Sequence, residues 1–133
     1  MGPRGQTLRV VLAEDEPLIA DILRNMLERE GHEVIPATDG ERALELIAAE
    51  PDRVDVLITD QHMPRLSGLG LVSKLRDTAF SGVIVVHSSS LTNAERDAFN
   101  ALAVDHFLSK PVKAAVWQTL VRSIAECIAS RRA

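Results

Sequence analysis

Four apolar segments of this sequence are each followed at once by side chains that carry a charge or a hydroxyl group. These side chains belong to Glu14 and Asp15, to Asp60, to Ser88 and to Lys110. Carboxylates held close together repel one another and raise each other's pKa, a cost that a hard divalent cation removes. Mg²⁺, or Mn²⁺, prefers oxygen ligands, and no cysteine or cluster of histidines is near that would favour a softer metal.

The carboxylate of Asp60 could act as a nucleophile beside such a cation and accept a phosphoryl group as an acyl phosphate. Lys110 would then neutralise charge on the transferring group, and the Ser88 hydroxyl could donate a hydrogen bond to one of its oxygens. Each residue alone has a simpler interpretation, because an aspartate after a strand usually forms a turn and a lysine before proline is usually a solvated charge. The combination predicts cation-assisted phosphoryl transfer to Asp60.

A regular alternation of strands and helices would position these residues. Apolar runs predict strands over residues 8–13, 32–37, 54–59, 83–87 and 105–109. Helix signals lie between and after them: Pro17 in a first turn, the opening Asp39-Gly40-Glu41, Ser67 as a cap, the capping box Thr92-x-x-Glu95, and apolar spacing from Val116 to Ile128. Five strand–helix repeats indicate a doubly wound α/β fold, a five-stranded parallel sheet with helices on both faces. Ligand sites in such sheets lie beyond the carboxyl ends of the strands, so the charged residues would share one cleft.

Length and composition fit a single domain, with 133 residues, a net charge of −4 and 46% hydrophobic residues. We expect residues 1–7 to be a disordered lead-in, residues 8–130 to form the domain and residues 131–133 to be a tail. The mild acidity and the lack of a basic stripe argue against direct binding of nucleic acid. No apolar run approaches the roughly 18 residues that a membrane span needs.

Cys127 is the single cysteine, so no intrachain disulfide can form, and we expect the protein in the reducing cytoplasm. Because Cys127 lies in an apolar helical pattern, we expect it to be buried as a small hydrophobic residue without a redox or catalytic role. The histidines at positions 32, 87 and 106 are scattered, and we interpret none as a metal ligand.

From about residue 8 to residue 128, the sequence resembles a response-regulator receiver domain, the phosphoacceptor module of two-component signalling. The matched places are the acidic pair Glu14-Asp15, Asp60 followed by Met63-Pro64 and Gly68, Ser88, and Lys110-Pro111. The resemblance is to single-domain, chemotaxis-regulator-like members and implies a flavodoxin-like sheet with strand order 2-1-3-4-5. It also implies a regulator that assists its own phosphorylation and dephosphorylation but is not an enzyme.

The resemblance implies that Asp60 accepts a phosphoryl group from the phosphohistidine of a sensor histidine kinase or a phosphotransfer protein. Asp15 and Asp60 would bind Mg²⁺ directly, and Glu14 would act mainly through metal-bound water. The backbone carbonyl of His62 would complete the protein ligands, and Lys110 would contact the phosphoryl group.

The same resemblance implies a conformational switch. Ser88 would swing toward the phosphoryl group and Phe107 would turn inward behind it, which would remodel the face of the fourth helix, fifth strand and fifth helix for a downstream effector. We also hypothesise that His62 and Ser90 flank the approach of water and set the lifetime of the acyl phosphate. Trp117 on the last helix could lie near this output face or pack against the edge of the core.

Four residues depart from the commonest pattern of the family. Glu14 replaces aspartate, Ser88 replaces threonine, Ser89 replaces a smaller alanine or glycine, and Ala103 replaces glycine before the fifth strand. None of these changes removes a required group, although Ser89 slightly crowds the phosphoryl pocket and the turn at Ala103 could differ.

Several other functions remain as alternatives. The chain could be a receiver module excised from a hybrid histidine kinase or a larger regulator, or a receiver that acts only as a scaffold. An aspartate-nucleophile phosphatase would carry Asp-x-Asp after the first strand, where Pro17 blocks that geometry here. A flavin or nucleotide binder would need a glycine- or hydroxyl-rich phosphate loop at that place, and the acidic pair would repel phosphate.

Overall fold

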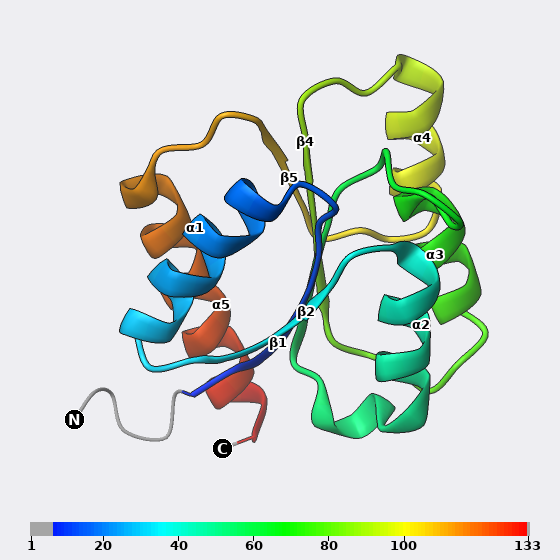
Figure 1. Cartoon of the computed structure of the whole chain (residues 1–133). Coiled ribbons are helices and arrows are strands. Elements are labelled where there is room, and N and C mark those ends of the chain that lie inside the picture. The colour runs from blue at the N-terminus through cyan, green and yellow to red at the C-terminus, as the bar shows by residue number, and fades with distance from the viewer. Residues whose placement is uncertain (1–6, 133) are drawn as a thin grey trace.

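A computed structural model describes residues 7–132 of the chain (Figure 1). Five parallel strands form one sheet in the order β2-β1-β3-β4-β5, and the α/β fold and strand order predicted above are confirmed. The strands are β1 (Arg9–Ala13), β2 (Glu33–Ala37), β3 (Val56–Thr59), β4 (Val83–Ser88) and β5 (His106–Ser109). The helices are α1 (Pro17–Arg29), α2 (Gly40–Ala49), α3 (Gly68–Leu75), α4 (Asn93–Ala101) and α5 (Ala114–Arg132), with a 3-10 turn η1 (Pro51–Arg53) before β3.

The ends of the chain bear on the expected domain boundaries. The lead-in expected over residues 1–7 lies outside the described residues except for Thr7, and Ala133 also lies outside them. Helix α5 continues to Arg132, two residues beyond the boundary expected at residue 130. No helix within residues 7–132 is long and apolar enough to cross a membrane.

Helices cover both faces of the sheet, with α1 and α5 on one face and α2, α3 and α4 on the other (Figure 1). Successive strand residues point to opposite faces, so each interior strand contributes to two cores. In β1, Val10 packs in the same cluster as Trp117, and Val11 packs in the second cluster with Leu71. Trp117 therefore lies in the core between α5 and the sheet, which decides between its two predicted positions.

Local sequence signals account for the helix ends. Asp39 caps α2 by accepting a hydrogen bond from the Arg42 backbone, and Ser67 caps α3 by accepting one from Gly70. Both hydrogen bonds of the predicted capping box are present at the start of α4. These side chains satisfy backbone N–H groups that the first helical turn leaves unpaired.

The prediction for Cys127 is wrong, because its side chain is exposed. Helix α5 buries the stripe Trp117, Val121, Ile124 and Ile128. At 100° per residue, Cys127 lies outside this stripe. The apolar pattern of α5 is thus wider than the surface that the sheet and α1 cover, and Val116 is exposed for the same reason.

Strand register brings the functional candidates to one edge of the sheet. Ala13 of β1 is paired with Thr59 of β3, so the next residues, Glu14 and Asp60, lie at the same level of the sheet. Backbone hydrogen bonds continue one residue further, from Glu14 N to Ala37 O and from Asp60 N to Ala13 O, each 3.0 Å. Both residues are therefore held by the rigid sheet rather than by a free loop.

The start of α3 packs directly against the backbone of the phosphoacceptor candidate. Gly68 donates a backbone hydrogen bond of 2.9 Å to the Gln61 carbonyl, and a Cβ atom at Gly68 would clash with the carbonyl oxygen of Asp60. Because the clash would be with backbone atoms, it could be relieved only by moving the backbone of Asp60 or the start of α3. A Cβ at Gly70 would instead meet the Leu66 Cδ1 atom, the end of a flexible side chain.

We therefore expect Gly68→Ala to lower the free energy of unfolding by about 1–3 kcal/mol, the usual cost of overpacking. Gly70→Ala is the matched control and should be neutral or stabilising, because alanine favours a helix by about 1 kcal/mol over glycine. Urea unfolding of both variants measures the difference. Equal stability of Gly68→Ala and the parent would contradict the close packing described here.

Candidate functional site

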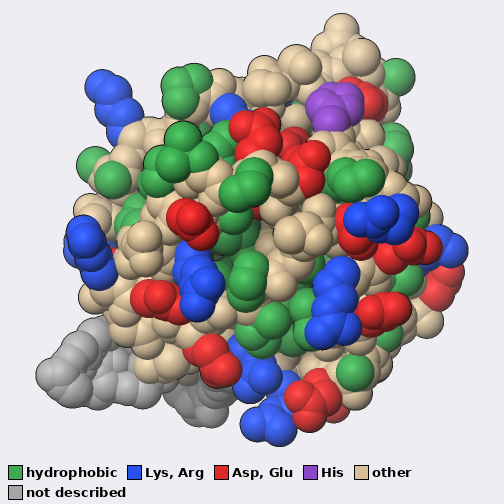
Figure 2. All heavy atoms as spheres, in the orientation of Figure 1, with side chains coloured by type: hydrophobic (Ala, Val, Ile, Leu, Met, Phe, Trp, Pro, Cys, Tyr) green, Lys and Arg blue, Asp and Glu red, His purple; other side chains and the backbone are tan. Residues whose placement is uncertain are grey.

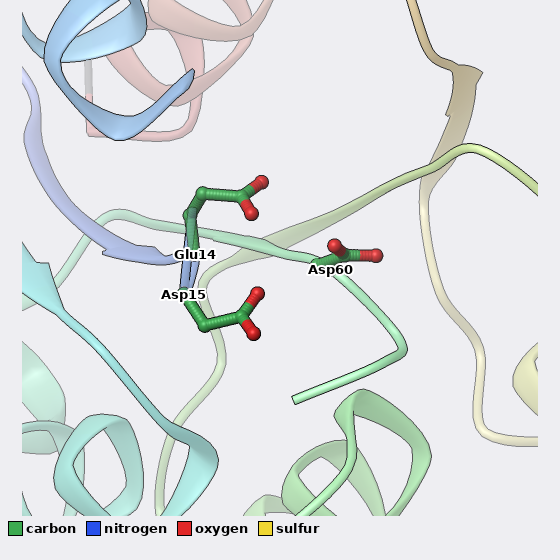
Figure 3. Close-up of side chains that lie close together, drawn as sticks. All are labelled: Glu14, Asp15 and Asp60. Atoms are coloured by element: carbon green, nitrogen blue, oxygen red, sulfur yellow. The ribbon is translucent and has the colours of Figure 1, made fainter. Parts of the chain in front are cut away.

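Three carboxylates meet at the carboxyl ends of β1 and β3. Glu14, Asp15 and Asp60 each offer an oxygen, and these oxygens all lie within 4.8 Å of one another. Figure 3 shows the Glu14 and Asp15 side chains extending from the end of β1 toward the side on which Asp60 lies. Glu14 is 3% exposed and Asp60 is 6% exposed, whereas Asp15 is partly exposed. Figure 2 shows acidic side chains gathered at the surface above this place, near the start of α1.

Lys110 brings a largely buried positive charge into contact with two of these carboxylates. Its ammonium nitrogen lies 2.8 Å from Asp60 Oδ2 and 2.9 Å from Glu14 Oε1. The Lys110 side chain is 9% exposed, and its backbone N–H donates to the Ser88 carbonyl at 3.0 Å. The structure therefore brings the ammonium of Lys110 into direct contact with both Glu14 and Asp60 at the carboxyl edge of the sheet.

The charges of this cluster do not balance. Burial raises the pKa of Glu14, and hydrogen bonds from Lys110 and from the Glu16 backbone oppose that rise only in part. Burial also acts to lower the pKa of Lys110, but hydrogen bonds to Asp60 and Glu14 outweigh it and leave that pKa raised. Lys110 thus stays charged, and its ammonium lies within 4.0 Å of the carboxylates of Glu14, Glu16 and Asp60. Asp15 adds a fourth carboxylate nearby.

The donor set fits a hard divalent cation. All three candidate ligands are carboxylate oxygens, which Mg²⁺ and Mn²⁺ prefer over nitrogen or sulfur donors. A further positive charge at this place would also offset the cost of burying Glu14, which the single contact with Lys110 does not remove. The cluster can therefore bind a cation and still present Asp60 to an incoming group.

Ser88 and Phe107 lie on the side of the site that faces α4. Ser88 is buried, and its hydroxyl donates only a long hydrogen bond of 3.5 Å to the Ser90 carbonyl. No hydrogen bond joins Ser88 to Asp60 in the described part of the chain. Phe107 is half-buried, packs edge-to-face on Phe99 at 6.1 Å and lies 4.7 Å below the guanidinium carbon of Arg96. Phe107 also lines a groove of about 890 Å³ between α4, β5 and α5.

His62 and Ser90 come together from the two loops that flank the site. The Nε2 atom of His62 lies 3.2 Å from the Ser90 backbone carbonyl, and both residues are exposed. This contact joins the loop after β3 to the loop after β4. The pair thus lies at the surface, where the loops that follow Asp60 and Ser88 meet.

Two residues of the loop after β3, Gln61 and Arg65, make side-chain contacts that no pattern in the sequence predicts. Gln61 is buried, and hydrogen bonds join its side chain to α3 and α4. The Arg65 guanidinium lies 2.8 Å from Asp39 Oδ2 and joins the loop after β3 to the start of α2. A single polar residue in a loop has no periodicity that would indicate its partners. Glu95 lies 34 residues from Gln61, and Asp39 lies 26 residues from Arg65, so spacing in the sequence could not identify these pairs.

His87 lies below the site on β4, in the core shared by α1 and α5. Its ring packs edge-on against Trp117 at 5.0 Å, and neither ring nitrogen has a hydrogen-bond partner within residues 7–132. Burial lowers the pKa of His87 to about 4, helped by the charge of Lys110 and opposed by that of Asp60. His87 is therefore neutral at pH 7, and the structure shows no metal-binding partner for it among the described residues.

Comparison with known proteins agrees with this fold. The family model described as the response regulator receiver domain matches residues 10–122. Response regulator GtcR of Aneurinibacillus migulanus is 36% identical over 102 residues, which cover 77% of this chain and 41% of GtcR. Sensory/regulatory protein RpfC of Xanthomonas campestris is 32% identical over 133 residues, which cover 97% of this chain and 18% of RpfC. The chain thus spans less than half of the length of either relative.

Solved structures show the same fold. The N-terminal domain of an uncharacterized protein from Wolinella succinogenes superposes with a TM-score of 0.87 at 23% identity, covering 94% of this chain and 99% of that one. The receiver domain of sensor histidine kinase PA1611 from Pseudomonas aeruginosa, solved with a magnesium ion in its active-site cleft, gives 0.80 at 20% identity, covering 90% and 98%. The chain belongs to the response regulator receiver domain family. Members of this family typically accept a phosphoryl group, work with histidine kinases and are regulators rather than enzymes.

The lowered pKa of His87 predicts a loss of stability in acid. An unfolded histidine takes up a proton near pH 6.5, whereas folded His87 resists protonation down to about pH 4. The unfolded state therefore binds more protons between these values, and the free energy of unfolding should fall by up to about 3 kcal/mol as the pH drops through this window.

His87→Leu should flatten this pH dependence, because leucine cannot titrate and leaves no unpaired buried nitrogen. Urea unfolding of the parent and the variant between pH 7 and pH 4 measures the effect. The same acid-induced loss in both proteins would show that His87 does not cause it.

Proposed function

We propose that this protein is a phosphorylation-dependent switch in which Asp60 accepts a phosphoryl group from a phosphohistidine. The donor would be a sensor histidine kinase or a phosphotransfer protein. The observation that carries this proposal is the contact of Lys110 with Asp60 at 2.8 Å, at the point where three carboxylates converge. This arrangement keeps a nucleophilic oxygen and a charge-neutralising ammonium together at one edge of the sheet.

The transfer would proceed by direct attack. An Asp60 carboxylate oxygen would attack the phosphorus of the phosphohistidine, so a P–O bond forms while the P–N bond breaks. The departing imidazole would take up a proton, and the phosphoryl group would stay on Asp60 as an acyl phosphate. Lys110 would turn from its carboxylate partners to the phosphoryl oxygens, where its charge opposes the negative charge that builds up.

Glu14, Asp15 and Asp60, with the backbone carbonyl of His62, would hold Mg²⁺ or Mn²⁺ in this site. When bound, such a cation supplies charge neutralisation for the transferring phosphoryl group. Glu14 is longer by one methylene than the aspartate common at its position, and we propose that it acts mainly through water. Pro17 at the start of α1 keeps this acidic segment at the end of β1.

Phosphorylation would change the face formed by α4, β5 and α5. The Ser88 hydroxyl has only a long hydrogen bond and is thus free to turn toward a phosphoryl oxygen. Phe107 would move inward as Ser88 leaves, away from its contact with Arg96. The groove that Phe107 lines would then change shape, and we propose that a downstream effector binds there.

We expect one phosphoryl group to be added to the protein by acetyl phosphate or phosphoramidate in the presence of Mg²⁺. Intact-mass spectrometry measures the addition. Asp60→Ala should show no addition, whereas Asp52→Asn, an exposed carboxylate on η1, should react like the parent. Chelation of the cation by EDTA should slow the reaction at least about tenfold, because the phosphoryl charge then lacks its counter-ion.

The outcomes of this experiment separate the alternatives. Addition to the parent and to Asp52→Asn, but not to Asp60→Ala, supports the switch. No addition to the parent with any donor would contradict it and leave a receiver that acts as a scaffold.

The contact between His62 and Ser90 leads to a prediction about the rate at which water hydrolyses the acyl phosphate. We propose that the two residues shield Asp60 from water, so His62→Ala should shorten the half-life at least about threefold by opening the gap between the two loops. Ser90→Ala should have a smaller effect, because His62 contacts the backbone carbonyl of Ser90 rather than its hydroxyl. Loss of phosphate from the purified phosphoprotein gives both rates. Parent-like rates in both variants would refute the shielding role.

A further inference from the structure

The side chain of Gln61 is a buried polar group that the proposed transfer of phosphate leaves unexplained. Gln61 follows Asp60 directly and is 6% exposed. Its Oε1 atom accepts a hydrogen bond of 2.7 Å from the Leu69 N–H in the first turn of α3. Its Nε2 atom donates a hydrogen bond of 3.2 Å to Glu95 Oε2 on α4. One side chain thus joins two helices that lie on the same face of the sheet (Figure 1).

The backbone of Gln61 reaches the phosphoacceptor itself. Its N–H donates a hydrogen bond of 2.7 Å to Asp60 Oδ1, and its carbonyl accepts one of 2.9 Å from Gly68. An acyl phosphate carries about 1.5–2 negative charges where the Asp60 carboxylate carried one, so phosphorylation would add up to about one negative charge next to this N–H. Any shift of the Asp60 carboxylate is therefore transmitted to Gln61 by a direct bond.

Glu95 is the residue that links Gln61 to the start of α4. Its Oε1 atom accepts a hydrogen bond of 2.9 Å from the Thr92 N–H, and Thr92 Oγ1 accepts one of 3.0 Å from the Glu95 N–H. The capping box thus uses one carboxylate oxygen of Glu95, and Gln61 uses the other. These hydrogen bonds lower the pKa of Glu95, so the carboxylate is charged.

The other end of α4 has an anchor of its own. Arg76, at the end of α3, donates hydrogen bonds of 2.8 Å to the Leu102 carbonyl and 3.1 Å to the Ala103 carbonyl. Ala103 holds a left-handed backbone with φ of 62°, a conformation that is costly for alanine and that these bonds support. Arg76 lies eight residues after Gly68, which is about 12 Å along the axis of α3 from the end of that helix that packs against Asp60. The anchor at Arg76 is therefore separate from the contacts of Gln61.

We infer that Gln61 is a positioning residue that couples the phosphorylation state of Asp60 to the amino-terminal end of α4. In the unphosphorylated protein, Gln61 holds Glu95 and with it the first turn of α4. Phosphorylation shifts the Asp60 oxygen that accepts the Gln61 N–H, so Gln61 moves and its hydrogen bond to Glu95 breaks. Helix α4 then moves at its amino-terminal end while Arg76 retains its carboxyl-terminal end. This link acts beside the change at Ser88 and Phe107, and it rests on the proposed phosphorylation of Asp60.

Hydrogen exchange of the α4 amides, with and without phosphorylation by acetyl phosphate and Mg²⁺, tests this link. In the parent, exchange at residues 93–97 should rise at least about threefold on phosphorylation, because the first turn loses its restraint. In Gln61→Met, which keeps the size of the side chain but has no amide, exchange there should already be high and should not rise further. Linkage also requires that a larger fraction of Gln61→Met than of the parent be phosphorylated at equilibrium with the donor, since the restraint that opposes the phosphorylated state is gone.

Two further variants separate coupling from simple loss of packing. Arg76→Met removes the anchor at the other end of α4, so exchange should rise at residues 100–103 while the response of residues 93–97 to phosphate remains. Glu95→Gln keeps a side chain that can close the capping box but removes its charge. In this variant the side-chain oxygen at position 95 would serve the Thr92 N–H, so its amide nitrogen would face that of Gln61, donor against donor, and the link is lost while the capping box can still close. Exchange at residues 93–97 should therefore already be raised before phosphorylation and should rise less than in the parent afterwards.

The result that overturns the inference is a phosphorylated Gln61→Met whose α4 exchange changes as much as that of the parent. An Arg76→Met variant that abolishes the response of residues 93–97 would also overturn it, because any loosening of α4 would then suffice. If the parent itself gains no phosphoryl group by intact mass, the proposed function fails and this inference fails with it. These results are distinguishable, because the first two require a phosphorylated parent.

Discussion

The buried contact of Lys110 with Glu14 and Asp60 is the interaction on which the rest of this structure depends. A single ammonium lies 2.9 Å from one carboxylate and 2.8 Å from the other, and Asp15 adds a further negative charge nearby. Such a cluster is costly to bury, because desolvation penalises every charge in it. Burial raises the pKa of Glu14, and the excess of negative charge in the cluster favours an added cation. The same imbalance leaves Asp60 an electron-rich oxygen beside a positive charge, which is what a phosphoryl group requires of its acceptor.

The two sides of this cluster differ in rigidity. On the side of β1 and β3, backbone hydrogen bonds continue the sheet past both acidic residues and fix them in register. On the side of α4, the contacts are made by side chains: a long hydrogen bond from Ser88, a stacked Phe107 and the amide of Gln61. A chemical change at Asp60 therefore meets a rigid backbone on the side of β1 and β3, and side-chain contacts that can rearrange on the side of α4. This difference explains how a local event could reach the groove between α4, β5 and α5.

The sequence was sufficient to predict the fold and the meeting of acidic and basic residues at one edge. Parallel strands all point the same way, so residues that follow β1, β3 and β5 lie at one edge of the sheet. The strand order 2-1-3-4-5, which the family resemblance implied, then brings them close together. The exposure of Cys127 could not be predicted, because apolar periodicity shows which stripe is preferred but not how wide a surface the sheet covers. Leu18 is 72% exposed on α1 for the same reason. The contacts of Gln61 were also beyond prediction, since one of its partners, Glu95, lies 34 residues away and depends on how α4 packs.

The central claim is that the Asp60 carboxylate, and no other group in the cluster, receives the phosphoryl group. Borohydride reduces an acyl phosphate to the alcohol, so a phosphorylated aspartate becomes homoserine, and tandem mass spectrometry then identifies the residue. We expect homoserine at position 60 alone after treatment with acetyl phosphate and Mg²⁺. Reduction at Glu14 or Asp15, or phosphate recovered on a serine or histidine side chain, would contradict the account.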